Sequence, residues 1–244
     1  MNINNKGLWI FAAIAGIALI VTGFLVTNAI YKIKSSENSI AVTGSAKRNV
    51  TSDLVKWTVS FSRNIDVSGL KNGYTSMKKD LEIVEAYLKT NGINNDTYTV
   101  SPVFVESVYN YKQDGGNQLA GYTLKQDIII QATDLQKITK LAQDVTPIIN
   151  QGIIFSTRSL EYFYTKLPEA RVELLAEATK DAKNRAEKIA QSTGSQVAAL
   201  RSASAGVIQV LQPNSTDVSD YGSYDTSTIE KEITAVIRVS FSLK

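Results

Sequence analysis

The chain has 244 residues, of which 43% are hydrophobic, and its formal net charge is +3. This composition excludes a disordered chain and allows one large domain or two small domains with hydrophobic cores. The sequence contains neither cysteine nor histidine, which excludes disulfides, the usual zinc ligand sets, and Ser-His or Cys-His catalytic pairs. Because the basic residues are scattered, we expect no nucleic-acid partner.

An uncharged segment runs from Gly7 to Tyr31 near the N-terminus. As a helix, it is long enough to cross the hydrocarbon layer of a bilayer. A cleaved secretory signal is the alternative, but its apolar region is usually shorter, and the only small-residue site nearby is the weak Thr27-Asn28-Ala29. We therefore predict an uncleaved transmembrane helix and linker over residues 1–36, with the lipid bilayer as a partner.

The remaining chain, residues 37–244, alternates between strand and helix patterns. The predicted strands are Ser39–Ala46, Asp53–Ile65, Thr97–Tyr111, Tyr122–Thr133, Ile153–Thr165, Val197–Gln212 and Ile229–Leu243. The predicted helices are Asp66–Thr90, Asp134–Val145 and Pro168–Gly194, with Asp134 as a cap and Pro147 as a stop.

This order indicates an α+β fold, with mixed or antiparallel sheets and three long helices after the transmembrane helix. The βαββαβ run up to Thr165 permits a ferredoxin-like split arrangement. The sequence leaves open whether residues 37–244 form one domain or two subdomains, about 37–150 and 151–244.

The helix predicted over Pro168–Gly194 has the clearest limits. Proline tolerates the first helical turn, and glycine adopts the left-handed conformation that ends a helix. Its apolar stripe includes Ala170, Leu174, Ala178, Ala182 and Ala186. Such a stripe either packs on the chain's own sheet or contacts a second copy of the chain, and the first use is the more common.

Tyrosines are the candidates for an interaction surface. Tyr109, Tyr111 and Tyr122 flank a predicted hairpin tip, Gln113 to Gln118, while Tyr221 and Tyr224 lie in the segment Pro213 to Thr228. Tyrosines around a loop can form a binding surface, although strand aromatics more often pack across a sheet.

Motifs for chemistry are missing from the sequence. The aspartates between Pro213 and Thr228 do not have the spacing of a calcium-binding loop. No G-x-S-x-G, phosphate-binding loop or glycine-rich dinucleotide turn occurs. We therefore expect no catalytic residue, no cofactor and no metal ion.

Several segments together resemble the SIMPL domain family, a domain of unknown function that includes bacterial periplasmic immunogenic proteins. The resemblance rests on Ile40-Ala41-Val42-Thr43-Gly44, Gly121-Tyr122, Ala170-Arg171, Ala182, Arg185, Ala186, Ala190, Gly194 and the final strand through Val239. It implies an exported α+β envelope protein without an established enzymatic activity, which in some relatives assembles into ring-like or channel-like oligomers. The chain departs from the family pattern at Val50-Thr51-Ser52-Asp53 and in its retained anchor.

Together, these features predict a single-pass protein of a bacterial cell membrane. Its C-terminal domain is expected on the extracytoplasmic (periplasmic) side, acting by binding or as a homo-oligomer. Lys6 before the anchor and Lys32 and Lys34 after it lean toward a cytoplasmic domain, but the resemblance outweighs these few charges. One alternative is a band 7-like membrane scaffold, although Gly194 stops the helix before a coiled coil can follow. The other is a hydrolase that uses carboxylates or a Ser-Lys pair.

Overall fold

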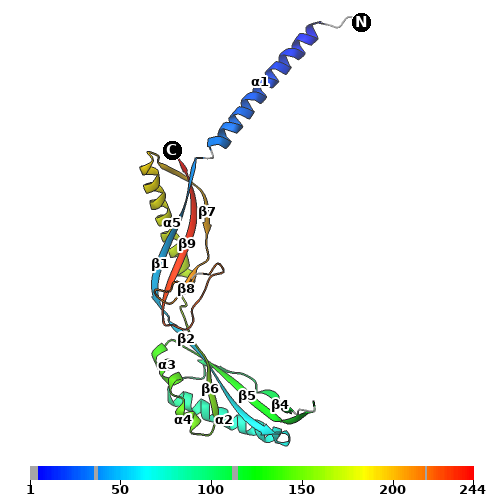
Figure 1. Cartoon of the computed structure of the whole chain (residues 1–244), viewed down its shortest axis with the longest axis vertical. Coiled ribbons are helices and arrows are strands. Elements are labelled where there is room, and N and C mark those ends of the chain that lie inside the picture. Colours follow the sequence, from blue (N-terminus) through cyan, green and yellow to red (C-terminus); the bar gives the residue numbers. More distant parts are fainter. Residues whose placement is uncertain (1–4, 36–37, 112–114, 218) are drawn as a thin grey trace. The chain divides into compact units, whose positions relative to one another are not determined.

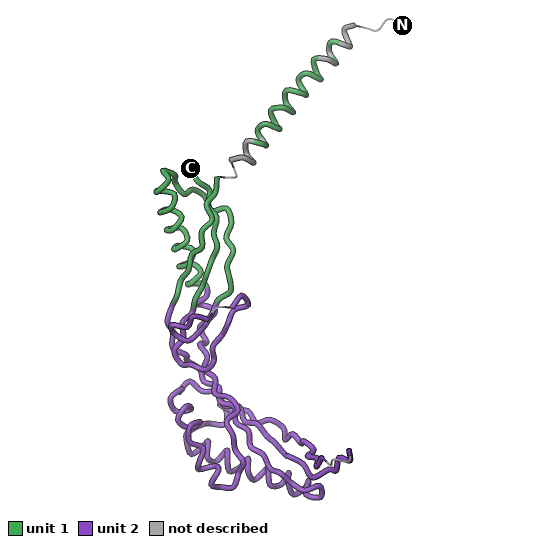
Figure 2. The backbone as a smooth tube through the Cα atoms, viewed as in Figure 1, with its two compact units in different colours: residues 1–47, 172–208, 234–244 green, residues 48–171, 209–233 purple. Residues whose placement is uncertain are grey.

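The computed structural model describes residues 5–35, 38–111, 115–217 and 219–244. The chain divides into two compact units, each built from segments far apart in the sequence (Figure 2). Unit 1 comprises residues 1–47, 172–208 and 234–244, and unit 2 comprises residues 48–171 and 209–233. Each of the two suggested subdomains, 37–150 and 151–244, therefore contributes to both units.

The uncharged N-terminal segment forms helix α1, Asn5–Ser35. Its exposed large side chains include Trp9, Phe11, Ile14, Ile17, Leu19, Ile20, Phe24, Leu25 and Ile30. No helix within the described ranges is both long and apolar enough to cross a membrane. The predicted helix is thus confirmed, whereas its predicted membrane span is not.

A sheet ordered β1-β9-β7 lies mostly in unit 1, and a short strand whose residues belong to unit 2, β8, also pairs with β9. These strands are β1 (Ser39–Thr51), β7 (Val197–Ala205), β8 (Gln209–Leu211) and β9 (Glu230–Leu243). Helix α5, Leu167–Ser192, lies along one face of the sheet (Figure 1). The inward residues Val42, Ile237, Val239 and Phe241 form a core with Ala178, Ala182 and Ala186.

The alanine stripe of α5 packs on the sheet of its own chain. Ala170, Leu174, Ala178, Ala182 and Ala186 are all buried. The helix approaches β1 at Gly44, where an added Cβ would lie only 2.1 Å from the backbone oxygen of Ala178. These five side chains therefore belong to the core of the chain, and they are not a surface for a second copy.

The predicted end of α5 is confirmed at Gly194, which has a φ of 73°. The N–H of Ser195 donates to the carbonyl of Ala190 at 2.9 Å, and the N–H of Gly194 donates to that of Gln191 at 3.3 Å. This pair of hydrogen bonds is the Schellman motif, which uses a left-handed glycine to satisfy the last carbonyls of a helix.

Unit 2 is built around β2, Leu54–Asp66, which pairs antiparallel with β5 on one side and β6 on the other. The far edge of β5 pairs antiparallel with β3 and β4. The order β3-β5-β2-β6 is that of the ferredoxin-like arrangement which the βαββαβ run permits. The other strands are β3 (Tyr98–Val100), β4 (Phe104–Tyr111), β5 (Asn117–Ala132) and β6 (Ile154–Phe163).

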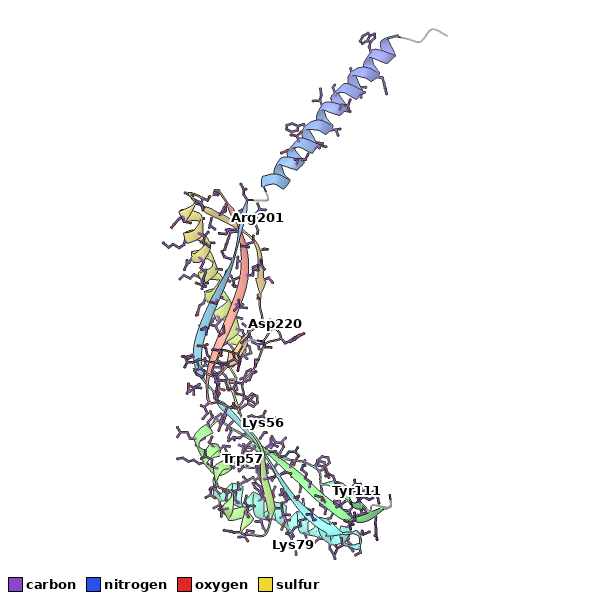
Figure 3. All side chains as sticks on the ribbon, in the orientation of Figure 1. Lys56, Trp57, Lys79, Tyr111, Arg201 and Asp220 are labelled. Atoms are coloured by element: carbon purple, nitrogen blue, oxygen red, sulfur yellow. The ribbon has the colours of Figure 1, made fainter. Side chains whose placement is uncertain are left out.

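Helices cover one face of this sheet (Figure 1). They are α2 (Leu70–Thr90), α3 (Leu135–Gln143) and α4 (Thr146–Ile149), and a short 3-10 turn, η1 (Val67–Gly69), precedes α2. The alternation of β2 correctly predicted its buried face, because Val55, Trp57, Val59 and Phe61 are fully buried. Trp57 is labelled on β2 in Figure 3.

Some predicted boundaries are wrong. β1 extends to Thr51 instead of ending at Ala46, and β5 begins at Asn117 instead of Tyr122. The hairpin of β4 and β5 is therefore longer than predicted, and residues 112–114 of its predicted tip lie outside the described residues. Pro147 does not stop a helix but lies in the first turn of α4, where its missing N–H has no cost.

Candidate functional site

Strand β4 is the most exposed strand of unit 2. It pairs with β5 on one side and has no strand partner on its other side within the described chain. All eight of its residues are exposed, and five of them are large and apolar: Phe104, Val105, Val108, Tyr109 and Tyr111. An edge strand with free backbone N–H and C=O groups is a template for another strand. We call this surface the β4 edge.

Tyr109 and Tyr111 lie on the β4 edge, as the interaction-surface hypothesis requires. Tyr111 is 82% exposed and lies near the end of the β4–β5 hairpin (Figure 3). Tyr122 is different, because it lies on β5 between Ile65 of β2 and Ser107 of β4 in the strand register. It is half-buried and is therefore not part of the β4 edge.

The two tyrosines between Pro213 and Thr228 have different environments. Tyr221 is 97% exposed. The hydroxyl oxygen of Tyr224 accepts a hydrogen bond from the backbone N–H of Tyr164 at 2.9 Å, and its ring stacks on Phe163 at 6.1 Å between centroids. Tyr224 is half-buried, and these contacts stabilise the fold of unit 2.

The sequence reasoning missed Lys231, whose side chain is completely buried in unit 2. Its Nζ donates to the backbone oxygens of Asp225 at 2.5 Å and Thr228 at 2.6 Å, and it lies 3.7 Å from the Asp225 carboxylate. Burial lowers the pKa of Lys231, while Asp225 opposes that change. Lys231 lies on the same face of β9 as the strand's buried apolar residues, because every second residue of a strand shares a face. This alternation is visible in the sequence and could have predicted that Lys231 is buried.

Asp225 is expected to make stability depend on acid pH. Burial alone raises its pKa, but hydrogen bonds from Ser227 and Thr228 and the charge of Lys231 outweigh burial and lower it to about 2. A lowered pKa stabilises the fold above the ordinary value of 3.8, and this stabilisation of about 2 kcal/mol is lost as the pH falls from about 4 to about 2.

The check is urea unfolding of the wild type and Asp225→Asn at a series of pH values between about 5 and about 2. The wild type should lose its stability advantage over the variant across this range. The control is Asp217→Asn, because Asp217 is exposed in the same segment. An advantage that stays constant with pH would contradict the expected role of Asp225.

Clusters suited to metal chemistry are not found: within the described ranges, no group of three or more acidic side chains could hold a metal ion. The surface that stands out is instead the β4 edge, where five large apolar side chains line an open backbone. Such a strand can recognise another strand through main-chain hydrogen bonds.

Comparison with known proteins gives one family. No curated protein matches the chain. The family SIMPL, described as "Protein of unknown function (DUF541)", matches residues 40–241, which run from the start of β1 nearly to the end of β9. Because this match spans most of the chain and both of its units, the chain belongs to the SIMPL family.

Proposed function

We propose that this SIMPL protein is attached to a bacterial membrane by α1, faces the extracytoplasmic side, and assembles with further copies of itself through the β4 edge. It acts by this assembly and not by catalysis. The observation that carries the proposal is the β4 edge itself, which is apolar, fully exposed and open along its backbone.

Attachment by α1 is supported by the chemistry of its surface. The segment from Gly7 to Tyr31 has no charged residue, and large apolar side chains such as Trp9, Leu19 and Phe24 are exposed. Transfer of apolar surface out of water is worth about 25 cal/mol per Å². A lipid environment would therefore stabilise α1. The extracytoplasmic location rests on the export that the family resemblance implies.

Self-assembly through β4 is supported by its pattern of charge. The strand has one charged residue, Glu106. When two β4 strands pair antiparallel about Ser107, each Glu106 faces Val108 of the other copy, so like charges do not meet. The exposed side chains Val105 and Tyr109 can then form apolar cross-strand pairs, and the backbones complete the hydrogen bonds of a continuous sheet.

The experiment uses the absence of native cysteine. Ser107→Cys places one thiol at the middle of β4, and Ser68→Cys places one at an exposed position in η1 as the control. A membrane-impermeant bismaleimide applied to intact cells should give a covalent dimer of the first variant and not of the second. Adding Val105→Lys should reduce association about 30-fold, because it removes about 1 kcal/mol at each of two symmetric positions.

The other outcomes separate the parts of the proposal. A dimer that forms only after cell lysis would place the domain in the cytoplasm. Equal cross-linking of both cysteine variants, or none of either, would reject assembly through β4. The same cells can be broken and washed with alkaline carbonate. Protein that leaves the membrane pellet would reject attachment by α1.

A further inference from the structure

A groove of about 640 Å³ lies in unit 2, between the first half of α2 and the adjoining ends of β2, β4 and β5. Its polar lining includes Arg63, Asn64, Asp66, Asn72, Ser76 and Tyr122. This volume is in the range of small-molecule sites, which are usually few in a protein. We propose that this groove, which Val108 of the β4 edge also lines, binds a neutral carbohydrate; the proposal uses no contact between copies of the chain.

Two glycines set the walls of the groove. A Cβ at Gly73 of α2 would lie 2.7 Å from the Leu124 side chain and 2.8 Å from that of Ile65. A Cβ at Gly121 of β5 would lie 2.2 Å from the backbone oxygen of Ile65. The backbone of α2 at Gly73 therefore lies directly against the side chains of Leu124 and Ile65, and the backbones of β2 and β5 come close together at Gly121. Its polar groups are held on rigid elements, which lowers the cost of ordering them around a ligand.

The charges of the groove disfavour an anionic ligand. The guanidinium of Arg63 is already paired with Asp80, through Nε and through Nη2, which lies 2.7 Å from Oδ1. Asp80 is only 1% exposed. Its buried carboxylate neutralises the positive charge of Arg63. Asp66 adds a carboxylate without a hydrogen-bond or ion-pair partner in the described chain. A phosphate or carboxylate would face this negative charge with no spare cation.

The remaining polar groups suit a polyhydroxylated ligand. Asp66 accepts hydrogen bonds, while the amide of Asn72 and the hydroxyls of Ser76 and Tyr122 both donate and accept. None of these four side chains has a hydrogen-bond partner among the described residues. Sugar hydroxyls also donate and accept at once. The half-buried ring of Tyr122 offers an apolar face for the C–H groups of a sugar ring, since tyrosine is amphipathic.

The test is calorimetric titration of the full chain, solubilised in a detergent without a sugar headgroup because such a headgroup would compete. The probes are chitotetraose, maltotetraose and mannotetraose, with inorganic phosphate as the anionic comparison. We expect at least one oligosaccharide to bind with a dissociation constant below about 1 mM. Its affinity should not change between about 0.05 and about 0.5 M NaCl, because the interaction is not ionic.

Variants then locate the site. Asn72→Ala should weaken binding about tenfold, and it should not disturb folding because Asn72 is exposed on α2 and alanine favours helix. Tyr122→Phe keeps the ring and should weaken binding less than Asn72→Ala. Tyr221→Ala, far from the groove in sequence and fully exposed, should leave the affinity unchanged. No binding of any oligosaccharide at about 10 mM, tighter binding of phosphate, or an unchanged affinity of Asn72→Ala would overturn the proposal.

Discussion

Gly44→Ala is expected to lower the free energy of unfolding by about 3 kcal/mol, because the added methyl group has no space. The new Cβ would lie 2.1 Å from the Ala178 oxygen, 2.5 Å from the Ala182 nitrogen and 2.7 Å from the Ala182 Cβ. Two of these three atoms belong to the backbone of α5, so a change of side-chain rotamer cannot relieve the overlap. The helix would have to move away from β1, and the tight core of unit 1 would open.

Urea unfolding followed by far-ultraviolet circular dichroism measures this effect. The control is Gly69→Ala, where the new Cβ would meet only the Ile65 Cβ at 3.6 Å, so a loss of a few tenths of a kcal/mol is expected. Adding Ala182→Gly to Gly44→Ala removes one overlap and leaves the two backbone overlaps, so the rescue should be partial. Equal stability of Gly44→Ala and Gly69→Ala would mean that α5 does not lie against β1.

The close packing at Gly44 shows what the sequence could and could not predict. The apolar stripe favoured packing of α5 on a sheet of its own chain, and Gly194 correctly predicted the end of the helix. Periodicity cannot identify the strand that receives a helix, because it describes only one segment at a time. The division into units was beyond the sequence for the same reason: β1 lies beside β9, from the opposite end of the chain.

The sequence pattern gave a reason for the exposure of the tyrosines on β4, but it could not distinguish the two tyrosines between Pro213 and Thr228. Tyr109 and Tyr111 are exposed because β4 is an edge strand, and the hairpin pattern already placed them beside a turn. Tyr221 and Tyr224 looked equivalent in a segment rich in serine and aspartate. They differ because Phe163 and the Tyr164 N–H, from the end of β6 and the residue after it, contact only Tyr224, and such long-range contacts leave no local pattern.

Arg63→Met is expected to lower the free energy of unfolding by about 3 to 5 kcal/mol, because it leaves a buried carboxylate without its partner. Asp80 of α2 is 1% exposed and binds the Arg63 guanidinium through both of its oxygens. This pair joins α2 to β2 beneath the proposed carbohydrate groove. Urea unfolding followed by the fluorescence of Trp57, which is buried in unit 2, measures the loss.

Two further variants test whether Arg63→Met is destabilising because Asp80 loses its partner or only because one charge is removed. Lys183→Met breaks an exposed pair with Glu187 and should cost about 0.3 to 0.5 kcal/mol. Arg63→Met combined with Asp80→Leu removes both charges and should recover most of the stability, because a buried ion pair contributes little beyond an apolar pair of similar size. If the double variant were less stable than Arg63→Met alone, the unpaired carboxylate of Asp80 would not be the cause of the loss. If Arg63→Met cost no more than Lys183→Met, Asp80 would have to be accessible to water.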